Sequence, residues 1–158
     1  MFREMLRKNK ALSQCECVRL LMNEKRGVLS VLGDEDYPYG MPMNHFYNED
    51  DGNIYFHCGD VGHRLEALRK HDKVSFCVFD RGQPIEGHWA MSVKSVIAFG
   101  KIEFVEDISI IEDIATKLSL KFTEDLEYIK NEIKAHGHRT VLMRLKTEHI
   151  CGKQIVES

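Results

Sequence analysis

Three segments with the composition of β-strands follow one another in the first half of the chain, and the connections between them are too short to hold a helix. Their sequences are GVLSVLG at 27–33, YPYGMPMNHFY at 37–47 and NIYFHC at 53–58. The second connection contains Asp51-Gly52, a dipeptide typical of tight hairpin turns. Strands joined this closely run antiparallel, because a parallel pair needs a crossover of about a dozen residues or more. This order favours an antiparallel sheet over a doubly wound parallel one.

Three more strands are expected later in the chain. KVSFCVFD at 73–80 is apolar on both faces, as in the interior of a sheet or barrel. SVKSVIAFGKIEFVED at 92–107 is a long strand in which Gly100 predicts a bulge or a barrel corner. RTVLMRLKTEHICGK at 139–153 supplies the last strand. With six strands that are mostly connected by hairpins, we expect an antiparallel barrel.

Helices are predicted to flank this barrel. Ser13 and Glu16 form a capping box at the start of the first helix, which covers residues 13–25 and ends at Gly27. The others are expected at 63–71, at 108–120, and from Thr123 as the N-cap to about residue 135. We therefore expect an α+β fold, mainly β, in which residues 1–158 form one domain.

Charge and hydropathy exclude two classes of partner. The formal net charge is −3 and the basic residues are scattered, so no basic stripe is available to follow a nucleic-acid backbone. The sequence has no apolar run near the ~20 residues of a membrane span, and the charged start, MFREMLRKNK, lacks the apolar core of a signal peptide. The five cysteines are odd in number and lie mostly in apolar patterns. They favour buried thiols in a reducing cytoplasm over a disulfide framework, so we expect a cytoplasmic protein.

The stretch FHCGDVGHRLEALRK, at 56–70, is typical of a strand that leads through a glycine-bounded loop into a helix. Gly62 permits close approach of the backbone, and Arg64 places a guanidinium in the first helical turn. Together with the free N–H groups of a helix start, these residues could hold an anion such as a phosphate. A solvated arginine is the equally simple alternative. The glycine patterns of dinucleotide-binding and P-loop proteins are both absent from the sequence.

The stretch GMPMNHF, at 40–46, is a second candidate. Pro42 predicts an edge strand, because proline cannot donate a hydrogen bond to a neighbouring strand. Met41 and Met43 could pack against a flat ring through their polarizable sulfurs, and Asn44 adds a donor and an acceptor. An ordinary edge strand with core methionines explains the same pattern.

Eight histidines suggest metal binding, yet their spacings match no motif with a metal mechanism. Cys58 beside His57 could be a nucleophile with its base, but successive strand residues point to opposite faces. No metal site or catalytic residue is therefore assigned. His57 and His45 are the candidates for a group that exchanges protons near neutral pH.

The order of the segments GVLSVLG, PYGMPMNHFYNEDDGNIYFHC, GHRLEALRKHDKVSFCV and SVIAFGKIEFVED resembles that of the pyridoxamine 5′-phosphate oxidase-like, FMN-binding split barrels. Within these it most resembles the nitroimidazole-resistance (nitroimidazole reductase-type) flavoproteins. The resemblance covers about residues 10 to 155, including ICGK near the end. It implies a six-stranded antiparallel split β-barrel that forms a homodimer, with FMN bound in clefts at the interface.

The resemblance also implies which residues bind the cofactor. The family's phosphate-binding positions match Cys58, His63 and Arg64, where His63-Arg64 replaces the Arg-Lys pair of the oxidases. The positions beside the flavin ring and its ribityl chain match Met41, Pro42, Met43, Asn44, His57 and Ser95. The C-terminal Trp and Arg-x-His pattern by which the oxidases bind pyridoxal phosphate has no counterpart, so specificity for a vitamin B6 compound does not carry over.

These observations give three hypotheses. The first is an FMN-dependent oxidoreductase that reduces a small organic acceptor, such as a nitroaromatic, with the flavin as redox centre. The second is a flavin- or haem-binding module without efficient turnover, in which His57, His45 or His149 would be the axial ligand of haem. The third is a structural or interaction protein without a cofactor.

Overall fold

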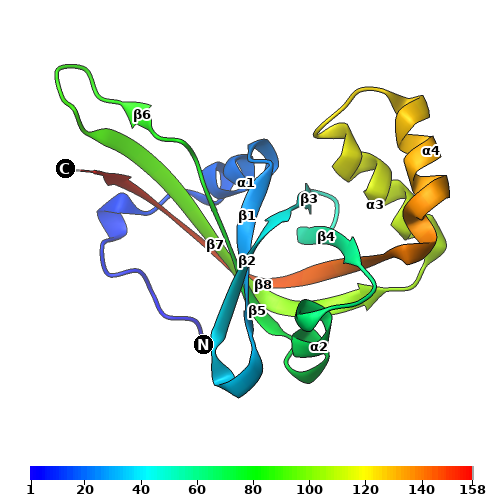
Figure 1. The fold of residues 1–158 in the computed structure, drawn as a ribbon. Helices are drawn as coiled ribbons and strands as arrows, with labels where there is room; N and C mark the ends of the chain where they lie inside the picture. Colours follow the sequence, from blue (N-terminus) through cyan, green and yellow to red (C-terminus); the bar gives the residue numbers. More distant parts are fainter. Residues whose placement is uncertain (158) are drawn as a thin grey trace.

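A strongly curled antiparallel sheet forms the body of the protein in the computed structural model, which describes residues 1–157 (Figure 1). Seven of its eight strands pair in the order β2-β1-β5-β7-β8-β4-β3, and the eighth, β6, pairs with β7. The strands are β1 (Arg26–Leu32), β2 (Pro38–Asn44), β3 (Phe46–Asn48), β4 (Asn53–Gly59), β5 (Lys73–Phe79), β6 (Gln83–Pro84), β7 (Met91–Val105) and β8 (Thr140–Val156). The six longer strands are the six that the sequence predicts, and β3 and β6 are short additions. The split-barrel, α+β class is confirmed.

The sheet does not close between β2 and β4. These two strands contact each other, but within residues 1–157 β2 pairs with β1 alone, and β4 pairs with β3 and β8. Because β3 reaches only as far as Tyr55, the end of β4 from Phe56 to Gly59 keeps a free edge toward this gap. The prediction that Pro42 lies in an edge strand is confirmed.

Apolar side chains at every second position of the strands fill the interior of the curl. In β5, Val74, Phe76 and Val78 are buried, whereas the residues between them are only half-buried. The expected position of this strand in the interior of the sheet is confirmed, because β5 pairs with β1 on one side and with β7 on the other, although only one of its faces is fully buried. Phe76 meets Phe56 of β4 edge to face, with ring centroids 4.9 Å apart, and this contact links the two sides of the barrel.

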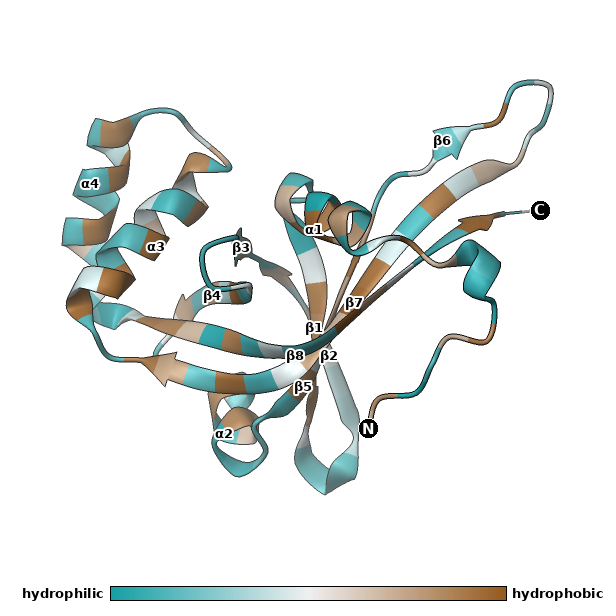
Figure 2. Ribbon diagram, turned by 180° about the vertical axis from the view of Figure 1, so that it is seen from behind, coloured by the Kyte–Doolittle hydropathy of each residue, from teal (hydrophilic) through white to brown (hydrophobic). Residues whose placement is uncertain are grey.

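Four helices accompany the sheet: α1 (Gln14–Asn23), α2 (His63–Lys70), α3 (Ile108–Leu120) and α4 (Leu126–His136). Short 3-10 turns lie at Lys8–Lys10, Asp34–Asp36 and Gly137–Arg139. The predicted capping box of α1 is confirmed, because Ser13 and Glu16 bond each other's backbone N–H groups. Figure 2 shows α3 and α4 as a pair at one end of the sheet, and Ile111 and Ile114 of α3 pack with Tyr55 of β4 and Leu142 of β8. No helix among residues 1–157 has the length and apolarity to cross a membrane.

Two predicted helix boundaries are wrong. Gly27 does not end α1, which stops at Asn23; it lies inside β1, where a side chain would come within 2.5 Å of the Phe76 ring and of the Cys77 carbonyl. Thr123 does not cap α4. The cap is Asp125, whose carboxylate accepts a hydrogen bond from the backbone N–H of Tyr128.

A bulge interrupts the pairing of the two longest strands, β7 and β8, as Gly100 predicts. The pairing of β7 with β8 shifts between Phe99 and Gly100, and a Cβ atom at Gly100 would overlap the Lys146 carbonyl. One end of this β7–β8 ribbon carries α3 and α4, and the other end carries β6 and the C-terminus (Figure 1).

Candidate functional site

A cavity of about 220 Å³ lies at the gap in the barrel, where β2 faces the turn from β4 into α2. It is lined by Tyr39 of β2 and by Cys58, Gly59, Val61, Gly62, His63, Arg64 and Leu65. Three of the predicted site residues, Cys58, His63 and Arg64, are therefore brought together here. We refer to this cavity as the anion seat.

The start of α2 exposes backbone donors to the anion seat. Gly62 is the N-cap residue, with φ of +124°, a conformation that residues with a side chain rarely adopt. It offers no capping side chain, and the N–H groups of Leu65 and Glu66 already bond the Gly62 carbonyl. The N–H groups of His63 and Arg64 precede the first helical bond and point toward the helix entrance. Such a site favours negative charge.

The Arg64 side chain supplies the cation of the anion seat. Its Nε atom is buried and, among the described residues, has no hydrogen-bond partner. A buried donor without a partner is costly, which indicates that an acceptor belongs there. The guanidinium lies close to Cys58, where burial raises the pKa of the thiol and Arg64 partly offsets this shift. A phosphate group would fit this donor set.

His63 is held at the rim of the anion seat. Its ring stacks on Tyr39 with centroids 4.6 Å apart, and its Nε2 atom lies 3.4 Å from the Asp34 carboxylate. Asp34 also pairs with Lys70, at 3.3 Å. Tyr39 and Asp34 thus orient His63, and Asp34 contacts both His63 and Lys70.

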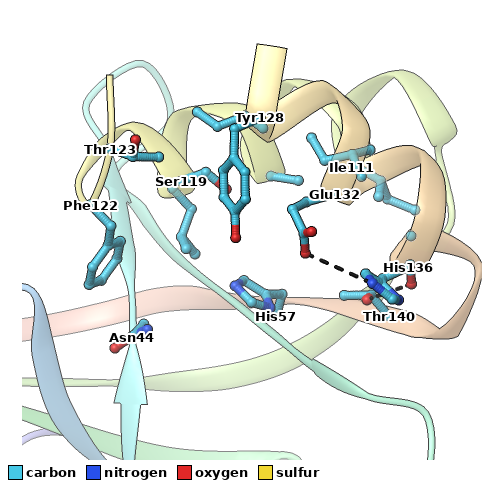
Figure 3. Close-up of a pocket in the computed structure, with 15 residues that line it drawn as sticks. Asn44, His57, Ile111, Ser119, Phe122, Thr123, Tyr128, Glu132, His136 and Thr140 are labelled. Carbon is cyan, nitrogen blue, oxygen red and sulfur yellow. Dashed lines mark hydrogen bonds and ion pairs between the residues drawn. The ribbon is translucent and has the colours of Figure 1, made fainter. Parts of the chain in front are cut away.

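A second cavity, of about 310 Å³, lies on the other face of β4, beneath α3 and α4 (Figure 3). It includes two more predicted residues, Asn44 and His57, and we call it the helix-pair cavity. His57 is exposed on the side of this cavity, and partial desolvation by its surroundings lowers the pKa of its ring. In Figure 3 the hydroxyl of Tyr128 points toward His57 and the carboxylate of Glu132 lies between His57 and His136. Glu132 and His136 form an ion pair at 3.9 Å.

Sequence reasoning missed the contribution of α4 to this cavity. Tyr128, Glu132 and His136 are spaced four residues apart and so share one face of the helix. That spacing is visible in the sequence, but it could not show that this face meets His57, about seventy positions earlier in the chain.

The remaining predicted residues take different positions. Met41 and Met43 are buried in the core, so β2 can offer a ligand only its backbone edge and its outward side chains, such as Pro42. Asn44 accepts a hydrogen bond from Arg26 Nε at 2.9 Å. Ser95 lies in the middle of the sheet, opposite Phe79 and Lys153, and is not among the described residues that line either cavity.

The three histidines proposed as haem ligands lie in different parts of the protein. His45 is fully buried, its Nε2 atom is 2.7 Å from the Leu21 carbonyl, and burial lowers its pKa to about 3. His149 stacks on Phe2 with centroids 4.8 Å apart. Of the three, only His57 lines one of the two cavities. Residues 1–157 contain no cluster of three or more His, Cys, Asp or Glu side chains arranged to hold a metal ion.

Solved structures share this architecture. A candidate 5-nitroimidazole antibiotic resistance protein from Bacteroides thetaiotaomicron matches with a TM-score of 0.77 and 18% identity, over 92% of this chain and 87% of that one. A conserved hypothetical protein from Mycobacterium tuberculosis gives 0.80 and 16%, over 95% and 90%. An FAD-binding protein from Mycobacterium smegmatis gives 0.67 and 19%, over 94% and 99%. At these identities the likeness shows the fold.

The sequence itself identifies the family. No curated protein matches the chain. The family model described as pyridoxamine 5′-phosphate oxidase matches residues 13–154, which is nearly the whole chain. The chain therefore belongs to the pyridoxamine 5′-phosphate oxidase family.

Proposed function

We propose that this protein is an FMN-dependent oxidoreductase that reduces a small organic acceptor. Membership of the pyridoxamine 5′-phosphate oxidase family supports a flavin cofactor. Structural neighbours described as FAD-binding proteins, from Mycobacterium smegmatis and Mesorhizobium loti, support it too. The neighbour from Bacteroides thetaiotaomicron, with its link to 5-nitroimidazole resistance, supports a nitroaromatic as the class of acceptor.

The observation that carries this proposal is the anion seat. Arg64 brings an unpartnered buried donor to the uncapped start of α2, and the glycine at position 62 leaves the backbone open to a ligand. The buried donor without a partner and the uncapped helix start both cost free energy when no ligand is bound, and a bound phosphate would explain both. Arg64 and the helix start would hold the flavin phosphate, with Cys58 and His63 beside it.

The same geometry favours FMN over FAD. The phosphate of FMN is a terminal monoester that carries close to two negative charges, whereas each phosphate of FAD is a diester with one. A guanidinium, a helix start and a histidine at the rim form a donor set that matches the monoester better. The neighbours described as FAD-binding make this comparison an essential part of the test.

The flavin ring would lie along the gap between β2 and β4, where both strands have free backbone edges. The Met41–Asn44 stretch would contribute mainly main-chain groups and the Asn44 amide, and His57 would lie at the end near the helix pair. Ser95 lies on another part of the sheet, so its contact would come from the second copy of a homodimer. Exposed apolar side chains support such a dimer, among them Val61 at 84% and Trp89 at 83% exposure.

When bound, the flavin would supply the redox chemistry and accept electrons from a donor such as a nicotinamide. The chain's own residues would hold the phosphate, orient the ring and keep His57 neutral next to it. The chain's proposed part in catalysis is to bind and orient the cofactor and the acceptor.

The test is the visible spectrum of the purified protein before and after incubation with FMN and removal of the excess. The proposal predicts a flavin spectrum at about one cofactor per chain, bleached by a nicotinamide and restored by a nitroaromatic. Light scattering after size exclusion should give the mass of a dimer. A Soret band would instead favour haem with His57 as the ligand to mutate, and a protein that ignores FMN would contradict the proposal.

A further inference from the structure

The helix-pair cavity is separate from the anion seat and has no role in holding the phosphate. Consecutive strand residues point to opposite faces, so Cys58 faces the anion seat and His57 faces the helix pair. At about 310 Å³ the cavity has the size of sites that hold small organic ligands.

One wall of the cavity is polar. α4 presents Tyr128, Glu132 and His136 in a line, and β4 presents His57 opposite them (Figure 3). Thr140 Oγ1 donates a hydrogen bond to the His136 carbonyl at 3.1 Å, which fixes the end of α4 to the start of β8. Asp125 fixes the other end through its cap. The polar wall is therefore held at both ends of the helix.

The other wall is apolar. It is built by α3 and the turn that follows it, with Ile129 of α4 completing it. The apolar side chains that line the cavity are those of Ile111, Ala115, Leu118, Phe122, Ile129 and Ile133. Flat apolar ligands bind such surfaces by displacing water, and the polar wall opposite would select their polar end.

The charges around the cavity select against anions. Among the described residues that line it, Glu132 is the only carboxylate, and no lysine or arginine lines it. Two cations at its edge, Lys25 and Arg26, lie over the Phe122 ring, 5.4 and 5.9 Å from its centroid, and Arg26 also bonds Asn44. The basic group beside Glu132 is His136, 3.9 Å away, and it offsets the carboxylate only when protonated. An anionic ligand would therefore meet the Glu132 charge, whereas a nitrogen-borne donor would bond it.

We propose that the helix-pair cavity binds a flat, mainly apolar molecule of one or two rings whose polar end is a nitrogen-borne hydrogen-bond donor, neutral or cationic, and that it rejects carboxylates of the same shape. Glu132 receives the donor, Tyr128 and His57 flank it, and the rings lie against the α3 wall. Because Asn44 and His57 also border the proposed flavin region, this ligand is the small organic acceptor. In a nitroaromatic the donor would be a ring or substituent N–H, because a nitro group only accepts hydrogen bonds. Only the identification of this ligand as the acceptor rests on the proposed function.

Titration calorimetry with the full chain tests this inference, using benzamidine and benzoate as matched probes of one shape and opposite charge. Benzamidine should bind at least about ten-fold more tightly than benzoate. Glu132→Gln should remove this preference, because it removes the carboxylate and keeps the shape. Glu127→Gln takes a carboxylate from the exposed first turn of the same helix and should leave the preference unchanged.

A second variant fills the cavity. Ser119→Trp places a large ring at the α3 wall and should abolish binding of benzamidine, with the melting temperature checked without ligand to show that the variant is folded. Equal binding of the two probes, unchanged binding by folded Ser119→Trp, or competition between benzamidine and FMN would overturn the inference. Failure to bind FMN, with the probe results intact, would contradict the proposed function and leave the binding site standing.

Discussion

His57 and Cys58 are adjacent in β4, yet their side chains line different cavities. His57 faces the helix pair, and Cys58 faces the anion seat at the start of α2. One strand thus separates the proposed place of the cofactor phosphate from the proposed place of the acceptor. Ligands of the two cavities should therefore act independently on these two side chains.

Cysteine labelling tests that separation. Burial raises the pKa of Cys58, so at pH 7.5 its thiol should react with iodoacetamide at least about ten-fold more slowly than that of exposed Cys15. FMN should slow the labelling of Cys58 further, and benzamidine should not. Peptide mass spectrometry follows both sites in one sample. Equal protection of Cys58 by both ligands would show that the cavities are not independent.

His45 should make the fold acid-sensitive. Its folded pKa is about 3 because it is buried, whereas an exposed histidine has a pKa of 6.5. Between these values the unfolded chain binds a proton that the folded chain does not, so stability falls as the pH falls. From pH 7.5 to 5.5 this group alone should cost about 1.4 kcal/mol.

The His45→Gln variant isolates this effect, because it retains a side-chain donor for the Leu21 carbonyl but does not titrate. Urea unfolding at the two pH values should show that the variant loses about 1.4 kcal/mol less stability than the natural protein over this range. Identical losses would mean that His45 is not kept neutral in the fold.

Lys121 should be a structural residue despite its charge. Its Nζ atom donates hydrogen bonds to the carbonyls of Glu24, at 2.7 Å, and of His45, at 2.9 Å, and burial lowers its pKa to about 8. Lys121→Met should therefore lower the free energy of unfolding by about 1–3 kcal/mol. Lys117→Met, which removes an exposed ion pair with Asp113, is the matched control and should cost clearly less. Equal effects of the two changes would contradict this role.

The Gly100 bulge should tolerate no side chain. A Cβ atom there overlaps the Lys146 carbonyl, so Gly100→Ala must shift the β7–β8 ribbon and should cost at least about 2 kcal/mol. Gly59→Ala is the control, because no atom lies within 4 Å of the position of its added methyl group. Thermal unfolding compares the two, and a stable Gly100→Ala protein would argue against the bulge.

Features that depend on residues close together in the sequence could be predicted, and features that depend on distant residues could not. The capping box of Ser13 and the hairpin at Asp51-Gly52 depend on residues a few positions apart, and both are present in the fold. The strand expected at 37–47 breaks at His45, because that ring turns into the core toward Leu21 and Phe76. No local pattern could show this.

In the candidate site, too, only the part built from residues close together in the sequence could be predicted. Gly62 and Arg64 lie within one turn of each other, so the anion seat could be predicted from one stretch of sequence. The helix-pair cavity joins β2, β4, α3 and α4 and needs the complete topology. The buried state of Met41 and Met43 likewise depends on which face of β2 meets the core.

The central claim is that Arg64 and the start of α2 hold a flavin phosphate. The most direct test is to titrate the natural protein, Arg64→Ala and Arg69→Ala with FMN, FAD and riboflavin, which lacks the phosphate. The account predicts that FMN binds most tightly, that Arg64→Ala loses about ten-fold or more of the affinity for FMN, and that its riboflavin affinity stays unchanged. Arg69→Ala, at the exposed end of the same helix, should behave like the natural protein. Riboflavin that binds as tightly as FMN, or full FMN affinity in Arg64→Ala, would contradict it.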